Sequence, residues 1–321
     1  MTEPNKAVFL LNSHSLSMPT SLVSSRERLR GIVSMVAAIF VFSIMDALMK
    51  RLSAHYGPLQ VSFMRCASSL VFVAMTIVWR RSWATLRLNN PMLHLARGAL
   101  GVTMLCGFVF AVHLLSLAQT YSLFLLAPLL MTALSMPIYG DRVTGKRWLA
   151  IVVGLSGVML ILQPWGRAVV SLAAAAAAAV ATVSYALSAL SVRSLGRTNS
   201  NLSMVFWYLV IVSIACAVLG VKQWQPIQSG DWGWLAGIGV SGALGQLWIT
   251  DAFRRAPASV VGPFEYTAIL WAFAIDWIFW SASPSPSLLL GAAIVIGSGV
   301  FVILDERRLA ELALTPASPP P

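Results

Sequence analysis

The sequence is poor in charged residues. Only 10% of its 321 residues are Asp, Glu, Lys or Arg, whereas an ordinary soluble domain carries about a quarter. So few charges disfavour soluble enzymes and soluble nucleic-acid-binding domains of this length. Acidic residues are especially scarce, at 11 in the whole chain, so each one inside an apolar stretch needs an explanation.

Cysteine and catalytic motifs are scarce as well. The three cysteines, Cys66, Cys106 and Cys216, each lie in an apolar run and lack CxxC spacing, which indicates packing rather than a disulfide framework or a zinc site. No HExxH, P-loop or nucleotide-binding glycine pattern occurs, so metalloprotease chemistry and ATP-driven transport lack the residues they need. We expect no enzymatic activity, no cofactor and no bound metal.

Long apolar segments make up most of the chain. The sequence is 58% hydrophobic, with a mean hydropathy of +0.79, and a helix needs about 20 apolar residues to cross ~30 Å of hydrocarbon. The pattern predicts an all-α integral membrane protein with ten transmembrane helices. Their expected ranges are 31–50, 60–79, 96–116, 118–138, 147–163, 168–190, 202–220, 233–252, 258–280 and 286–304.

The positions of Lys and Arg predict the orientation. Most of the 22 basic residues lie in alternate connections and in the N-terminal segment, whereas Lys50, Arg51, Arg167 and Lys222 lie in the others. Because positive residues stay on the cytoplasmic side, we expect both termini in the cytoplasm of a bacterial cell, with the spans in its inner membrane. The net charge of +11 therefore requires no nucleic-acid partner.

The ten spans divide into two halves of five, which must insert in opposite orientations. The segment "SGVMLIL" (156–162) in the fifth span matches "SGVFVIL" (298–304) in the tenth. We expect four regions: a disordered cytoplasmic segment (1–30), a first five-helix repeat (31–163), a second, inverted five-helix repeat (168–304) and a cytoplasmic Pro-rich tail (305–321).

Several separated motifs occur in a familiar order. They include "FSIMDALMK", "FMR", "LLAPLLMTALSMPIYGDRVTGKRW" and "GQLWITDAFRRAPASVVGPFEYTAILWAFAIDW". Through them the chain resembles the EamA-type members of the drug/metabolite transporter superfamily. The resemblance implies a solute cavity between the halves, lined mainly by the first four helices of each. Two positions depart from the family pattern, because Asp141 replaces a glutamate and Ala282 replaces an acidic residue.

Charged residues inside the spans are the strongest site candidates, because a charge there costs at least ~2.5–3.5 kcal/mol unless it is paired or hydrated. At 1.5 Å per residue, Asp46, Arg65 and Asp276 are expected in one layer near the outer boundary. Arg65 could pair with Asp46 and also with Asp276, forming an outer gate or one end of a solute site. Alternatively, Asp46 and Arg65 only hold two helices in register. Lys50 is expected to reach the membrane surface.

The segment "GPFEYTAILWAF" (262–273) is a second candidate region. A kink at its Gly-Pro pair would free backbone carbonyls, which are tolerated at this depth only when they are buried or line a wet cavity. Glu265, Tyr266 and Trp271 would then offer a carboxylate, a hydroxyl and an aromatic face to a solute; the aromatic residues could instead serve packing. Weaker cavity candidates are Gln246, Trp248, Tyr121, Ser122, Tyr185, Trp207 and Tyr208.

These observations favour a secondary transporter that moves small organic metabolites by alternating access. Export is preferred, and an uptake permease for a vitamin or nucleoside-like solute is the alternative. A non-transporting scaffold or sensor is a further one, as is an intramembrane hydrolase built on Ser156 of "GLSG" and His113. The expected partners are a small-molecule solute and the lipid bilayer, and a homodimer is left open.

Overall fold

The computed structural model describes residues 25–139, 145–162, 171–196, 198–255 and 261–314, in which every regular element is helical. The first half contains α2 (Ser25–Leu52), α3 (Pro58–Trp79), η2 (Trp83–Leu86), α4 (Pro91–Leu114), α5 (Leu117–Phe124), α6 (Ala127–Tyr139) and α7 (Gly145–Leu162). The second half contains α8 (Leu172–Leu195), α9 (Asn201–Gly220), η3 (Val221–Gln223), η4 (Ser229–Asp231), α10 (Trp232–Arg255), η5 (Gly262–Thr267), α12 (Ala268–Trp280) and α13 (Pro286–Leu314).

The helices have the length and composition of membrane spans. Within α2, α3, α4, α8 and α9 the apolar stretch is long enough to cross a bilayer, and shorter apolar helices lie within α5–α6, α7 and α13. Exposed large hydrophobic side chains, such as those of Trp79, Leu172 and Trp277, lie on many of the helices, as expected of a surface that faces lipid. The prediction of an all-α membrane protein is confirmed.

Two predicted spans are interrupted, each the fourth of its half. The range 118–138 was expected to be one helix, but α5 ends at Phe124 and α6 starts at Ala127. Pro128 follows at once, and a proline in the first turn lacks an N–H that could extend the preceding helix. The range 258–280 likewise is not continuous α-helix, because it contains the 3₁₀ helix η5 before α12. At the Gly-Pro pair, where a kink was expected, the chain forms this 3₁₀ helix.

The first and last helices of the chain, α2 and α13, extend beyond their predicted spans. α2 already begins at Ser25, so residues 25–30 belong to a helix and the expected disorder of 1–30 is wrong for them. α13 continues to Leu314, into the region expected to be a tail. Both extensions carry charged residues, which remain compatible with a helix once it leaves the hydrocarbon.

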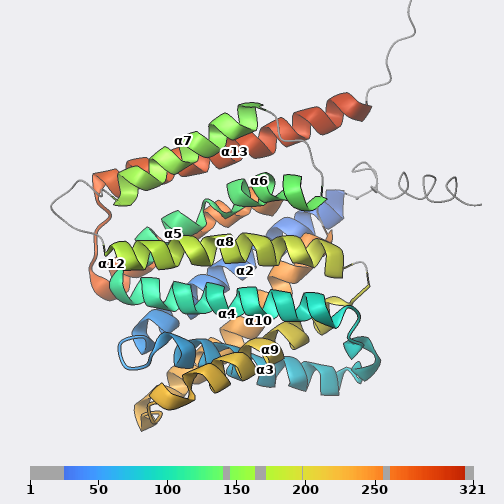
Figure 1. Cartoon of the computed structure of the whole chain (residues 1–321), viewed down its shortest axis with the longest axis vertical. Coiled ribbons are helices and arrows are strands. Elements are labelled where there is room, and N and C mark those ends of the chain that lie inside the picture. Colours follow the sequence, from blue (N-terminus) through green and yellow to red (C-terminus); the bar gives the residue numbers. More distant parts are fainter. Residues whose placement is uncertain (1–24, 140–144, 163–170, 197, 256–260, 315–321) are drawn as a thin grey trace, which may run out of the picture.

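Helices of the two halves pair with one another (Figure 1). α2 packs along α10 and α4 packs along α8, which is the corresponding pair when the halves are exchanged. α7 pairs with α13 at one edge of the molecule, and α3 pairs with α9 at the opposite edge. The first of these edge pairs is closely packed: a Cβ added to Gly157 would lie 2.8 Å from the Gly291 carbonyl oxygen, and one added to Gly154 would lie 2.9 Å from Ser298 Oγ.

Small residues allow the closest of these contacts. The alanine run of α8 has only small side chains, and α4 approaches it closely, because a Cβ at Gly107 would lie 2.7 Å from the Ala177 carbonyl oxygen. On α10, Gly242 and Gly245 play the same part against the side chains of α3 and α2: added Cβ atoms would lie within 3 Å of Ser69 and Phe42. Such close approach of helices through small residues is typical of membrane proteins.

Candidate functional site

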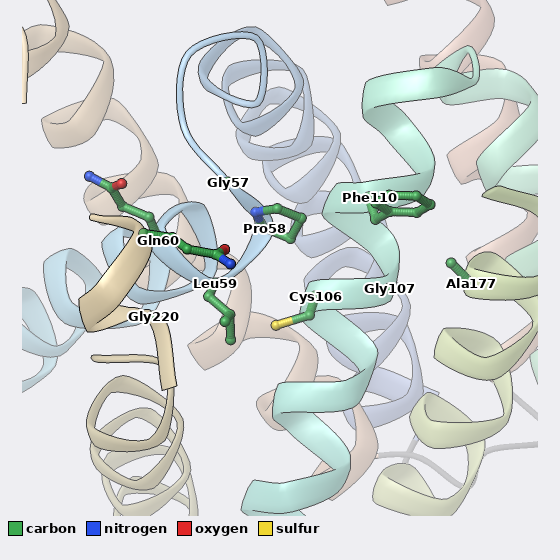
Figure 2. Close-up of a pocket in the computed structure, with 10 residues that line it drawn as sticks. Gly57, Pro58, Leu59, Gln60, Cys106, Gly107, Phe110, Ala177 and Gly220 are labelled. Carbon is green, nitrogen blue, oxygen red and sulfur yellow. The ribbon is translucent and has the colours of Figure 1, made fainter. Parts of the chain in front are cut away.

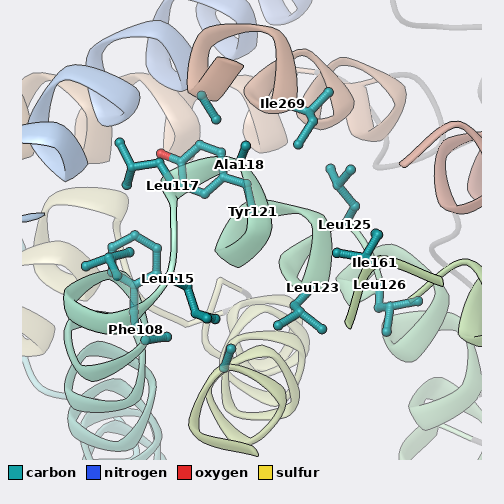
Figure 3. Close-up of a cluster of buried hydrophobic side chains, with 14 of the residues drawn as sticks. Phe108, Leu115, Leu117, Ala118, Tyr121, Leu123, Leu125, Leu126, Ile161 and Ile269 are labelled. Carbon is teal, nitrogen blue, oxygen red and sulfur yellow. The ribbon is translucent and has the colours of Figure 1, made fainter. Parts of the chain in front are cut away.

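A row of aromatic side chains lies between the two halves. It runs from Tyr121 on α5 through Phe108 on α4 and Phe124 on α5 to Tyr185 on α8, and we call it the aromatic row. Adjacent ring centroids are 6.2, 5.5 and 6.2 Å apart, which is the range of contacting aromatic pairs. Figure 3 shows Tyr121 among buried apolar side chains, with Phe108 on the neighbouring helix.

Each end of the aromatic row lies within electrostatic range of a carboxylate. At one end the Tyr121 hydroxyl donates a short hydrogen bond to Asp46 Oδ2 on α2. At the other end the Glu265 carboxylate, in η5, is close enough to Tyr185 to act on it electrostatically. Glu265 is half-buried and forms no hydrogen bond or ion pair with the described residues. An unpaired carboxylate inside a membrane protein can take up a proton or bind a cationic ligand.

Tyr266 and Trp271, both predicted as site residues, lie near Glu265 in sequence but differ in setting. Tyr266 is buried against α13, where its hydroxyl fills the space beside Gly299. Trp271 packs edge-on against Phe40 of α2, with centroids 4.7 Å apart. Neither the Tyr266 hydroxyl nor Trp271 Nε1 has a hydrogen-bond partner among the described residues, so both polar atoms are unsatisfied in this conformation.

Asp276 lies at the junction of three helices. Its carboxylate on α12 accepts hydrogen bonds from the backbone N–H groups of Leu117 and Ala118, at 3.2 and 2.8 Å, in the first turn of α5. Lys50 Nζ on α2 donates to the same carboxylate at 3.2 Å and lies 4.6 Å from the Trp280 ring centroid. A helix N-terminus and an ammonium group both stabilise a carboxylate. We call Lys50, Asp276 and the first turn of α5 the Lys50 cluster.

Two predictions about this region are wrong. Lys50 was expected to reach the membrane surface, but its side chain turns inward to Asp276 and is only 14% exposed. Asp46 and Arg65 were expected to form an ion pair, but no contact within 4.0 Å joins them in the described structure. The Asp46 carboxylate instead accepts from Tyr121, and Arg65 Nε donates to Met45 Sδ at 3.3 Å. Depth alone placed these groups in one layer without specifying which way each side chain turns.

Gln246 is the predicted site residue that the structure does not connect to the others. Its backbone carbonyl accepts a hydrogen bond from Thr250 within α10, and among the described residues no contact joins its side chain to the aromatic row or to the Lys50 cluster. The hydrolase alternative also finds no support, because Ser156 on α7 bonds to the Val153 carbonyl of its own helix and both Ser156 and His113 on α4 are exposed.

A second polar cluster lies at the opposite end of α2. Arg255 on α10 donates to Glu27 on α2 at 2.8 Å and to Asp251 at 2.6 Å, and Ser34 of α2 donates to Asp251 at 3.2 Å. We call these four residues the Glu27 cluster. The hydrogen bond from Arg255 holds the pKa of Glu27 below its ordinary value, and its two carboxylate partners raise the pKa of Arg255. Asp251 is thus paired with the arginine four residues later on the same helix.

Residues that the sequence did not single out also hold the halves together. Tyr56, between α2 and α3, donates to Asp231 at 2.7 Å and accepts from the Gln228 backbone N–H at 2.9 Å. Burial and the neighbouring carboxylate raise the pKa of Tyr56. Arg97, expected at the very start of the predicted span 96–116, lies well inside α4 and is buried. The proline that starts α4, Pro91, was the signal that would have placed it correctly.

One pocket opens between the ends of α3, α4, α8 and α9, with a volume of about 370 Å³. Figure 2 shows Cys106 and Phe110 of α4 beside Pro58 and Gln60 at the start of α3. It is lined mainly by apolar atoms and lies apart from the aromatic row. Among the described residues, no group of three or more His, Cys, Asp or Glu side chains could hold a metal ion.

Comparisons with known proteins agree with this architecture. The EamA-like transporter family matches residues 29–163 and 172–304. The chain is 29% identical to a pseudopaline exporter of Pseudomonas aeruginosa over 83% of this chain and 93% of the exporter. It is 28% identical to a riboflavin transporter of Vibrio cholerae, over 87% of this chain and 95% of the other. It is 22% identical to an S-adenosylmethionine uptake transporter of Rickettsia prowazekii, over 87% and 94%.

A solved structure shares the fold. It is titled only as a crystal structure of a protein, and it aligns with a TM-score of 0.64 at 18% identity, covering 87% of this chain and 98% of that one.

Proposed function

The chain belongs to the EamA-like transporter family, and we propose that it carries a small organic solute with a ring and a cationic group along the aromatic row. That the protein is a secondary transporter of small molecules, and not an enzyme, follows from the family and from its transporter relatives. The chemistry of the solute, the direction of transport and the residues of the path are our proposal.

The single observation that carries the proposal is the position of two carboxylates at the two ends of one aromatic row. Asp46 comes from the first half and Glu265 from the second. Aromatic faces attract rings by stacking and cations by their negative face, at about 0.5–2 kcal/mol per cation contact. A carboxylate at each end gives a cationic solute an ionic partner at both ends of the row.

The unsatisfied polar atoms around Glu265 support this assignment. Among the described residues Glu265 has no hydrogen-bond or ion-pair partner, and the Tyr266 hydroxyl and Trp271 Nε1 are unpaired as well. Buried polar groups are normally hydrogen-bonded, and exceptions gather at functional sites. A solute bound beside η5 would offer these groups hydrogen-bond partners. If Trp271 serves only in packing, its ring contact with Phe40 is explained, but the missing hydrogen-bond partner of Nε1 is not.

The Lys50 cluster supplies the gate in this proposal. With both termini in the cytoplasm, the end of α2 that carries Lys50 faces outward, as the Lys and Arg distribution favours. Asp276 then joins α12 to α2 and α5 on the outer side, and in this conformation the three helices are tied together there. Opening to the outside requires Asp276 to leave both partners. One chain contains the whole path, so the proposal does not require a homodimer.

We favour export from the bacterial cytoplasm across the inner membrane. The pseudopaline exporter is 29% identical to the chain, the Vibrio cholerae riboflavin transporter 28% and the Rickettsia prowazekii S-adenosylmethionine uptake transporter 22%. The direction is tested in inverted and right-side-out vesicles loaded with the same solute. Net movement out of the cytoplasmic compartment supports export, and accumulation in it supports the uptake alternative.

The solute class is tested by thermal unfolding of the purified protein against matched compounds. The compounds of one set share a ring system and differ in one substituent, which is an amine, a neutral group or an acid. Ring-bearing cations should raise the melting temperature, because a ligand that binds only the folded state stabilises it. The shift should be lost in Glu265→Gln and kept in Glu27→Gln, the same change at an exposed position outside the row.

Proteoliposome flux completes the test. Glu265→Gln should reduce flux of the stabilising solute or abolish its pH dependence while the protein still inserts into the membrane. Equal stabilisation of both variants, or stabilisation by ring acids alone, would refute the role assigned to the carboxylate.

A further inference from the structure

Two arginines are buried among the membrane helices, away from the aromatic row. Arg65 on α3 is 8% exposed and Arg97 on α4 is 7% exposed. The guanidinium group keeps its charge in proteins, and a charge inside a membrane helix is costly unless something compensates it. Two such groups in one region require an explanation from their surroundings.

Both arginines reach the same tyrosine. Arg97 Cζ lies 5.2 Å from the centroid of the Tyr208 ring, on α9, and Arg65 is near enough to Tyr208 to act on it electrostatically. Tyr208 is buried and lies hard against α4, where a Cβ added to Gly101 would be 2.5 Å from its ring. The phenol ring is therefore fixed in place, with the Arg97 guanidinium near its face and Arg65 within electrostatic range.

Neither guanidinium has its donors satisfied. Arg65 Nη1 and Arg97 Nε have no hydrogen-bond partner among the described residues. The contacts that exist are weak: Arg65 Nε faces Met45 Sδ at 3.3 Å, and Arg97 Nη1 faces the Met204 carbonyl oxygen at 3.4 Å. The buried hydroxyl of Ser69, one helical turn from Arg65 on the same face of α3, is also unpaired.

The region also lacks negative charge. Within the described residues no carboxylate lies within 4.0 Å of either guanidinium. Asp46 acts on Arg65 only at longer range, and its carboxylate already accepts from Tyr121. No acidic residue acts on Arg97. The space between α3, α4 and α9 thus holds positive charge and free donors without a matching acceptor, a state that low dielectric makes costly.

We propose that Arg65, Arg97 and Tyr208 form a binding site for one small anion between α3, α4 and α9. The anion accepts hydrogen bonds from Arg65 Nη1 and Arg97 Nε and is positioned by the Tyr208 hydroxyl, with Ser69 as a further donor. Chloride and a carboxylate or phosphate oxygen share this chemistry. The anion comes either from solution as a free ion or from an acidic group of a solute. The inference does not depend on the proposed cationic solute, since it concerns other residues, although α4 contributes to both regions.

The test is anion titration of the purified protein, followed by thermal unfolding. Chloride replaces gluconate at constant ionic strength and pH, and acetate, phosphate and a panel of organic acids are titrated separately. We expect the melting temperature of the wild type to rise and saturate with at least one of these anions. In Arg97→Gln the concentration needed for half of the shift should rise at least tenfold. Arg80→Gln, an exposed arginine at the end of α3, should respond like the wild type.

A second variant guards against misfolding of Arg97→Gln. Tyr208→Phe keeps the ring and removes only the hydroxyl, and it should weaken the response less than the loss of Arg97. Equilibrium binding of radiolabelled chloride or acetate to these proteins reads occupancy directly and does not depend on stability.

The pattern of active anions identifies the source. A saturable chloride response that Arg97→Gln weakens supports the site with a free ion as its ligand. A response confined to organic acids, again weakened by Arg97→Gln, supports the site with the acidic group of a solute as its ligand. No response to any anion, or the same response in Arg97→Gln and Arg80→Gln, overturns the proposal and leaves the two arginines hydrated.

Discussion

The Lys50 cluster and the Glu27 cluster both join the two halves by ion pairs, but they differ in burial and in what surrounds them. The Lys50 and Asp276 side chains are 14% and 3% exposed, whereas those of Glu27 and Arg255 are 39% and 35% exposed. Asp276 also accepts two backbone hydrogen bonds from α5. Water screens an exposed pair, and a buried one leaves an uncompensated charge when it is broken.

The surrounding packing sharpens the difference. The Glu27 cluster lies at the end of α2 and α10, two helices that touch along their length, so its ion pairs add little to a contact that glycines already make close. The Lys50 cluster instead ties α12 to α2 and α5 through a single carboxylate. An ion pair between halves is therefore a stronger candidate for a gate where the helices that it joins pack less extensively against each other, as α12 and α2 do compared with α10 and α2.

The largest effect is expected from Asp276→Asn. It leaves the Lys50 ammonium buried without a carboxylate, and breaking such a pair costs about 3–5 kcal/mol. Thermal unfolding of the purified protein should show a large loss of stability. In vesicles, Cys residues introduced near the start of α5 should become more reactive toward a membrane-impermeant maleimide.

The control for this prediction is the double variant Asp276→Asn with Lys50→Met, which removes the stranded charge. It should recover much of the lost stability while the outer end stays accessible. If the two substitutions act additively, Lys50 and Asp276 are not coupled and the gate is disproved.

An intermediate effect is expected from Tyr121→Phe, beside the Lys50 cluster. It removes the hydroxyl that donates to Asp46 and leaves a buried acceptor unpaired, at a cost of roughly 1–3 kcal/mol. Thermal unfolding measures the loss. Tyr185→Phe, at the other end of the row, is the matched control, since its hydroxyl donates no hydrogen bond in the described structure. A larger loss in Tyr185→Phe would contradict the role of the Asp46 contact.

A smaller effect is expected from Arg255→Gln in the Glu27 cluster. Its partners Glu27 and Asp251 are only half-buried, and α2 and α10 remain packed along their length without it. The melting temperature should change far less than in Asp276→Asn, and solute flux should persist. A loss of stability equal to that of Asp276→Asn would erase the distinction between the two clusters.

The smallest effect is expected from acidification around the Glu27 cluster. The pKa of Glu27 is lowered from 4.5 in the folded protein, so its contribution to stability is complete above about pH 4.5 and is lost as the pH falls through the lower, folded value. Titration of a ¹³C-labelled Glu27 carboxylate should show the lowered pKa, and Arg255→Gln should return it toward 4.5. An unchanged titration in that variant would exclude Arg255 as the cause.

Most of the fold could be predicted from the sequence, because the length of apolar segments and the positions of Lys and Arg can be read along the chain without knowing tertiary contacts. The helical breaks in the fourth span of each half were less readable. Pro128 and the Gly-Pro pair at 262–263 marked them, but the choice between a kink and a full break depends on tertiary contacts. The helical extensions at Ser25 and Leu314 were missed because hydropathy marks the apolar part of a helix and not the polar turns that continue it outside the membrane.

The candidate site was predicted less well, for a geometric reason. Depth can be counted along a helix, so Asp46, Arg65 and Asp276 could be assigned to one layer. The direction of each side chain depends on helix rotation and on the neighbour it meets, and this decided that Lys50 rather than Arg65 meets Asp276. Tyr121 and Tyr185 were among the weaker candidates, and only the packing of α4, α5 and α8 showed that they share one row.

The glycines of α10 have a mechanical consequence. Gly242 and Gly245 press one helix of the second repeat against α3 and α2 of the first, and Gly107 presses α4 against α8 of the other repeat. Contacts this tight resist sliding. The closest contacts therefore join helices of different repeats, α10 with α2 and α3 and α8 with α4, so a movement of either repeat as one rigid body would have to break them.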